Sequence, residues 1–160
     1  MIYLYDTREH DGKNQHILNA WDKMGITYKR RKLSYCDYSF MLPKNEELGI
    51  PRDLDFSRLV AVERKANLDE LAGNMTKERE RIKKELALAP QNKVLIIENG
   101  SYVDMVNGNY RSEYAAKSYF GTFHSFWHEF GIPIIFMPDK NYTGLFIRGY
   151  FQYYLRGIIK

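Results

Sequence analysis

The chain reads Leu59-Val60-Ala61-Val62-Glu63-Arg64-Lys65-Ala66-Asn67-Leu68-Asp69 at the point that decides its fold. An apolar run typical of a buried strand delivers three consecutive unlike charges, and a polar turn then opens a helical pattern. Side chains of a strand alternate in direction, so Glu63 and Lys65 share one face while Arg64 points to the other. Because the burial of unpaired charge is unfavourable, a buried strand that ends in three charges indicates a site where those charges have partners.

Outward from this strand, the spacing of apolar residues predicts elements in the order β, α, β, β, β, α, β, α, β, α. Residues 43–57 and 101–111 have turn composition, and we expect a loop or hairpin excursion in the first and a loop in the second. Hairpin-like strands followed by βα alternation imply a mixed sheet sandwiched by helices. The predicted strands cover residues 2–5, 26–33, 35–40, 59–65, 93–98 and 133–137, and the predicted helices 13–24, 67–89, 112–130 and 143–156.

Length and composition indicate a globular chain of 160 residues, which we expect to form a single domain over 1–160. Hydrophobic residues make up 44%, and no segment is apolar for long enough to span a membrane. A strand pattern begins at Ile2 without a secretion leader, and the single cysteine, Cys36, fits a reducing compartment, so a cytoplasmic location is expected. The net charge of +4 is weak support for an anionic partner.

Acidic residues recur at or near the ends of four predicted strands. Magnesium prefers oxygen ligands and takes one or two carboxylates together with waters and phosphate oxygens, a minimum that Asp37 and Glu63 supply. Lys65, on the same face as Glu63, is placed to orient a nucleophile or to offset negative charge, and Arg64 and Arg8 to hold phosphates or brace the acids. The acids are Asp6 with Glu9, Asp37, Glu63 with Asp69, and Glu98.

Three ordered segments carry a resemblance to a known family: Asp6-Thr7-Arg8-Glu9, Asp37-Tyr38-Ser39, and Glu63-Arg64-Lys65 followed by Asp69. Together they resemble the XPF-type structure-specific endonuclease domain of the PD-(D/E)XK nuclease superfamily. The resemblance implies a restriction-endonuclease-like α/β fold with a mixed central sheet flanked by helices. It also implies dependence on Mg²⁺ or Mn²⁺, cleavage of branched DNA such as flaps, forks or Holliday junctions in repair and recombination, and a homodimer.

The resemblance also assigns roles to individual residues. It makes Asp37 and Glu63 the metal ligands and Lys65 the catalytic lysine, with Arg64 and Arg8 completing the catalytic set. Asp6, Glu9 and Asp69 support the site, although Asp69 follows the predicted helix cap at Asn67, where a carboxylate also favours the helix dipole.

The chain departs from the family pattern in three ways. Cys36 stands where the family has a glycine, and an ordinary strand conformation there would accommodate most residues. The excursion between Asp37 and Glu63 is longer than in eukaryotic members. No helix-hairpin-helix module follows, which indicates a compact stand-alone enzyme of the kind carried by phages, working in a bacterial or infected host cell.

One further basic residue stands out within the predicted 67–89 helix. Arg79 interrupts the apolar stripe between Met75 and Ile82, so it is a candidate to reach the site or a DNA phosphate. The charged run around it is otherwise typical of a solvated helix face.

The leading hypothesis is a metal-dependent DNA endonuclease that acts on branched DNA. One alternative is a catalytically inactive DNA-binding partner of the same fold, against which the intact Asp37, Glu63 and Lys65 argue. Another is a sequence-specific restriction endonuclease on the same fold.

Overall fold

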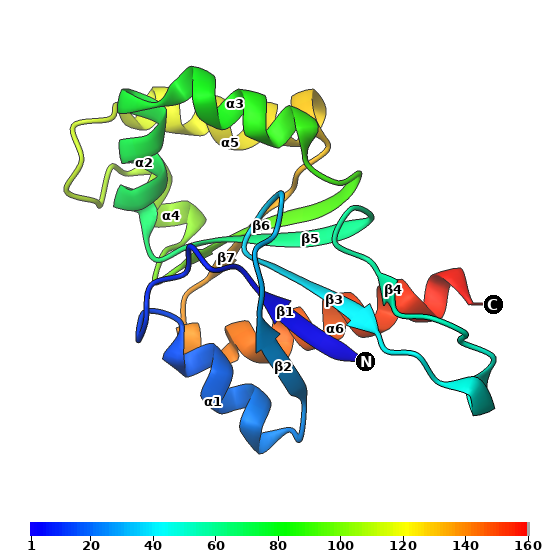
Figure 1. The fold of residues 1–160 in the computed structure, drawn as a ribbon. Coiled ribbons are helices and arrows are strands. Elements are labelled where there is room, and N and C mark those ends of the chain that lie inside the picture. The colour runs from blue at the N-terminus through cyan, green and yellow to red at the C-terminus, as the bar shows by residue number, and fades with distance from the viewer. Residues whose placement is uncertain (160) are drawn as a thin grey trace.

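A computed structural model describes residues 1–159, which build one mixed sheet covered by helices on both faces (Figure 1). The strand order is β2-β1-β3-β5-β6-β7, with the short β4 paired to β3. β5, β6 and β7 run parallel, as do β1 and β2, whereas β3 is antiparallel to both β1 and β5. The strands are β1 (Ile2–Tyr5), β2 (Thr27–Arg30), β3 (Tyr38–Leu42), β4 (Leu54–Asp55), β5 (Val60–Lys65), β6 (Asn92–Glu98) and β7 (Ile134–Met137). The helices are α1 (Gln15–Lys23), α2 (Leu68–Lys77), α3 (Arg79–Leu88), α4 (Tyr102–Val106), α5 (Ala116–Phe130) and α6 (Thr143–Ile158), with 3-10 turns η1 (Glu46–Leu48) and η2 (Lys140–Tyr142).

The two faces of the sheet bury separate hydrophobic cores. In the interior strand β6, Val94 and Ile96 pack into the core beneath α1 and α6, while Leu95 and Ile97 pack into the core beneath α2, α3 and α5. This alternation requires a strand that is apolar on both faces, which is typical of parallel strands with helices on each side. The predicted mixed sheet flanked by helices is thereby confirmed.

The strand β5 and the helix that follows it form where the sequence predicts them. The side chain of Asn67 accepts a hydrogen bond of 2.9 Å from the backbone N–H of Glu70, which caps α2. The Glu70 carboxylate accepts one of 2.7 Å from the N–H of Ala66 in return. These bonds fix the exit of the chain directly after the three charged residues of β5.

Several predicted elements have other bounds in the structure: the helix expected over 112–130 begins at Ala116, and the strand expected over 35–40 is β3. The single helix expected over 67–89 is broken at Glu78, whose backbone leaves the helical region at φ −135°, giving α2 and α3. A continuous helix would carry Arg79 into the buried stripe between Met75 and Ile82; the break turns Arg79 to solvent and leaves Ile82 buried. The loop expected over 101–111 contains α4, which is capped by the Ser101 hydroxyl.

The sequence predicts no segment that could span a membrane. Among residues 1–159, no helix is long and apolar enough to cross a bilayer.

Cys36 holds an unusual backbone conformation two residues before β3. Its φ is +62°, in the left-handed region that glycine favours, so the expectation of an ordinary strand conformation is wrong. The side chain is buried, and burial raises the pKa of its thiol well above the usual range, with the charges of Glu63 and Asp37 adding to the effect. The turn at Cys36 carries the chain into β3 with Asp37 directed toward β5.

Replacement of Cys36 with glycine and with alanine separates the backbone strain from the loss of the sulfur. Both variants remove the thiol, but only glycine adopts a positive φ freely, so Cys36→Gly should be more stable than Cys36→Ala by about 1 kcal/mol. Denaturant unfolding of the two proteins measures the difference. An alanine variant as stable as the glycine variant would show that the left-handed turn is not maintained.

Candidate active site

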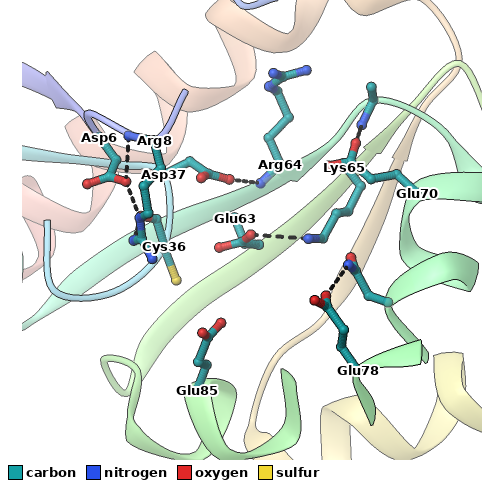
Figure 2. A network of polar contacts seen from close by, with 12 residues as sticks. Asp6, Arg8, Cys36, Asp37, Glu63, Arg64, Lys65, Glu70, Glu78 and Glu85 are labelled. Atoms are coloured by element: carbon teal, nitrogen blue, oxygen red, sulfur yellow. Dashed lines mark hydrogen bonds and ion pairs between the residues drawn. The ribbon is translucent and has the colours of Figure 1, made fainter. Parts of the chain in front are cut away.

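Asp37, Glu63 and Lys65 meet at one side of a pocket of about 400 Å³ between the sheet and α3 (Figure 2). The backbone N–H of Asp37 donates to the carbonyl of Val62 over 2.9 Å, which places the start of β3 against β5. The Lys65 ammonium lies 3.5 Å from the Glu63 carboxylate, as expected for residues on the same face of β5. The structure therefore gathers in one pocket the three residues for which the sequence predicts a shared site.

The two carboxylates lie in an environment that opposes their ionisation. Burial, followed by the negative charges of Glu63 and Glu9, raises the pKa of Asp37 well above its usual range. Burial likewise raises the pKa of Glu63, although the neighbouring Lys65 ammonium acts in the opposite direction. Such a pair of acids is stabilised by an added cation between them, and perturbed carboxylates in a pocket are typical of functional sites.

Lys65 keeps its charge despite its burial. Burial works against the charged ammonium, but the carboxylates of Glu63 and Asp37 outweigh it, and the pKa of Lys65 is raised. A lysine with a raised pKa remains protonated at neutral pH, so its chemistry here is that of a fixed positive charge and hydrogen-bond donor rather than a base.

Arg64 points to the opposite face of the sheet, as the alternation of β5 predicts. Its guanidinium is buried and donates to the Glu9 and Glu98 carboxylates, each over 2.7 Å. Its backbone N–H, on the near side, donates to the Asp37 carboxylate over 2.8 Å. Arg64 therefore touches the metal-binding candidates only through its backbone, while its side chain joins Glu9, which follows β1, to the end of β6.

Glu98 is the centre of this buried network on the far face. Besides Arg64, it bonds to His16 of α1, with 2.6 Å between His16 Nε2 and Glu98 Oε2, and it accepts a hydrogen bond of 2.5 Å from the Thr143 hydroxyl at the start of α6. His16 and Thr143 are not singled out by the sequence. Each lies more than forty positions from Glu98, and no local motif marks either residue.

Asp6 and Arg8 brace the segment that precedes Asp37. The buried Asp6 carboxylate accepts the backbone N–H of Leu33 over 2.7 Å and also binds the Arg8 guanidinium. Arg8 in turn reaches the carbonyls of Leu33 and Cys36, each over 3.4 Å, and lines the pocket. Asp6 thus has the contacts of a supporting residue, whereas Arg8 stands at the edge of the pocket itself.

Asp69 is directed to another part of the molecule. Its carboxylate accepts the backbone N–H groups of Arg111 and Ser112 over 2.8 and 2.7 Å. It does not line the pocket that holds Asp37 and Glu63. These contacts join the 111–112 loop to the first turn of α2.

Two basic residues of α3 line the pocket, Arg81 and Lys84. Arg79, the candidate from the sequence, is exposed at the start of α3 and does not line this pocket, because the break at Glu78 changes the direction of the helix. The only sequence signal for Arg81 is its i, i+4 spacing to Glu85, which many solvated helices share.

Comparison with solved structures finds the same fold in XPF from Aeropyrum pernix. The likeness has a TM-score of 0.70 at 18% sequence identity and covers 98% of this chain and 66% of that chain. A second structure of XPF from Aeropyrum pernix, in complex with DNA, gives a TM-score of 0.68 over the same shares at 18% identity. The chain thus spans about two thirds of the length of these structures.

Sequence comparison adds the family. A search of curated proteins finds no match, but the model of the ERCC4 domain matches residues 5–149. That range includes the acids and the lysine of the pocket and the buried network behind them. The chain therefore belongs to the ERCC4 domain family, and its fold is that of an XPF-type nuclease domain.

Proposed function

We propose that this protein is a Mg²⁺- or Mn²⁺-dependent endonuclease that hydrolyses phosphodiester bonds in branched DNA. The observation that carries the proposal is the pair of half-buried carboxylates, Asp37 and Glu63, with the Lys65 ammonium beside them in a pocket. The structure of XPF in complex with DNA supports DNA as the partner. The proposal treats residues 1–160 as one nuclease domain.

The pair of acids fits a hard divalent cation. Among residues 1–159 no group of three or more His, Cys, Asp and Glu side chains is arranged around a common point. Magnesium, however, commonly takes only one or two carboxylates and fills its remaining positions with water and phosphate oxygens. Asp37 and Glu63 would hold the ion, which when bound would lower the pKa of a water ligand and stabilise charge on the phosphate.

Other residues in and behind the pocket would supply positive charge to the substrate or fix the position of the carboxylates. The Lys65 ammonium, held by Glu63, donates to the attacking water or to a phosphate oxygen as negative charge develops there. The Arg64 backbone N–H holds one oxygen of the Asp37 carboxylate, so the remaining oxygen is directed at the pocket. Arg8, at the pocket edge, is placed to bind a flanking phosphate.

The branched substrate, the homodimer and the cytoplasmic setting of repair or recombination rest on the family resemblance. A solution mass of twice 19.0 kDa would support the dimer.

Substitution of the acids tests the proposed chemistry. Glu63→Gln and Asp37→Asn keep the shape of each side chain but remove the charge that would hold the metal, so cleavage should fall by at least about 100-fold while DNA binding remains. The measurement is cleavage of flaps, forks, four-way junctions and plain duplex with Mg²⁺ or Mn²⁺.

Glu47→Gln is the matched control, because Glu47 is exposed on η1 and makes the same change of charge away from the pocket. Full cleavage by either pocket variant would overturn the ligand assignment. If the unaltered protein leaves every substrate uncut, the proposed activity fails, whereas a defined cut site on linear duplex would favour a restriction enzyme.

The raised pKa of Asp37 predicts that ionisation of this carboxyl lowers the stability of the metal-free protein as the pH rises. In the unfolded chain the group ionises near its ordinary value of about 3.9. Because folding raises this pKa, the contribution of the group to stability is fully present below that value and is lost as pH rises through the folded-state pKa. Asp37→Asn should therefore be more stable than the wild type at about pH 8 in a chelating buffer, and the difference should shrink toward about pH 4.

Thermal unfolding of both proteins across this pH range checks the prediction. Added Mg²⁺ should stabilise the wild type at high pH and have little effect on the variant, since ligand binding to the folded state alone raises stability. A variant that is no more stable than the wild type at high pH would contradict the assigned repulsion.

Arg64 provides a test of the network behind the pocket. Arg64→Met leaves the buried Glu9 and Glu98 without a cation and should destabilise the protein by about 3–5 kcal/mol. Arg64→Lys retains the charge but cannot bind both carboxylates in a fork, so a smaller loss is expected. Denaturant unfolding gives the stabilities, and cleavage at a temperature where both variants are folded shows whether the site is displaced. Normal stability of Arg64→Met would contradict the network.

A further inference from the structure

The pocket has a second wall, opposite the sheet, that the proposed chemistry does not use. This wall is α3, whose Ile82 and Leu86 are buried in the core, while Arg81, Lys84 and Glu85 line the pocket. Figure 2 shows Glu85, together with Glu78 from the break before α3, directed toward Glu63 and Lys65. The pocket therefore lies between a catalytic wall on β5 and a charged wall on α3.

Arg81 is held at this wall by two carboxylates. One terminal nitrogen of its guanidinium donates to Glu85 over 2.8 Å, and the other is paired with Glu78. A guanidinium has five N–H donors in a fixed plane, so two bonds leave three donors for another acceptor. The Arg81 side chain is 52% exposed, which leaves those donors accessible from the pocket.

The two acids orient the Arg81 side chain without using all of its N–H donors. Exposed ion pairs contribute little to stability, typically less than about 1 kcal/mol. The fold therefore does not depend on the two ion pairs of Arg81. What two pairs at i−3 and i+4 achieve is to restrict a long side chain to one position. A side chain that is already ordered loses less entropy when it binds a ligand.

We infer that Arg81 binds a backbone phosphate of the DNA that flanks the scissile one, across the pocket from Asp37 and Glu63. This inference rests on the proposed function, because it takes the pocket to hold a DNA strand. The planar fork of arginine matches two oxygens of one phosphate. Each cation on the sheet wall also faces a carboxylate, Lys65 with Glu63 and Arg8 with Asp6. Of the two cations on α3 that line the pocket, Arg81 offers a planar fork held in one position by its ion pairs, whereas Lys84 offers a single ammonium on a flexible stem, so the contact on the second wall is assigned to Arg81.

Salt-dependent binding distinguishes a phosphate contact from a general effect of charge. The probe is a fluorescein-labelled forked duplex, and binding is measured by anisotropy between about 50 and 200 mM salt in a Glu63→Gln background, so that the DNA is not cut. Arg81→Gln should weaken binding roughly tenfold at the lower salt and reduce the slope of log K against log salt by about 0.9. Arg81→Lys should retain the slope but bind more weakly, because the charge remains and the fork is lost.

Lys83→Gln is the matched control. It removes one positive charge from the same helix, but Lys83 faces Glu129 of α5 at 3.7 Å and does not line the pocket. Its slope should equal that of the background protein. Arg79→Gln tests the neighbouring candidate in the same way.

The outcomes separate the inference from the proposed function. If the background protein does not bind the fork at all, the proposed function fails. If it binds, and Arg81→Gln has the same slope as Lys83→Gln, the inference is overturned while the proposed function stands. A slope that falls with Arg79→Gln and not with Arg81→Gln also overturns it. Circular dichroism confirms that each variant is folded, and Arg81→Lys carries the test should Arg81→Gln not fold.

Discussion

The rest of the structure depends on the buried ion pairs of Arg64 with Glu9 and Glu98. A buried guanidinium needs partners for its charge and for its donors, because its removal from water is compensated only by well-formed bonds. The two carboxylates come from the segment after β1, which β3 separates from β5, and from the end of β6, which is next to β5, so their convergence ties both sides of the sheet to β5. His16 and Thr143 extend the same network to α1 and α6. One residue thereby connects both halves of the sheet with the helices on one face.

This constraint is transmitted to the pocket through the backbone. The residue whose side chain is fixed on the far face donates its N–H to Asp37 on the near face. Any displacement of the Arg64 peptide therefore moves Asp37 relative to Glu63. The alternation of a strand thus divides three consecutive charges between two places: Glu63 and Lys65 line the pocket, and the Arg64 side chain lies in the buried network behind it. The family model matches residues 5–149, a range that includes both the pocket residues and the residues of the Arg64 network.

Local patterns predicted the strands and helices well where the chain is strongly periodic, and failed where tertiary packing decides the conformation. The run before Glu63 is a buried strand, and the cap at Asn67 starts a helix, because both depend on neighbours in sequence. The break at Glu78 was missed, since residues on both sides favour a helix and only the cost of burying Arg79 argues against continuation. Cys36 was expected in an ordinary strand conformation, yet the turn that brings Asp37 to β5 imposes a positive φ there. Arg81 had no distinguishing signal, because its position depends on that same break.

By itself, the sequence determined the mixed sheet, the acids and lysine of the pocket, and the opposite direction of Arg64, because strand alternation is a property of the local backbone. Only the tertiary structure decided what those residues contact. It paired Arg64 with Glu98 across neighbouring strands, added His16 and Thr143, and gave Asp69 to a distant loop. It also closed the pocket with α3 and set Arg81 opposite Glu63. These contacts join segments far apart in the chain, and they depend on how the strands and helices pack rather than on any spacing that the sequence displays.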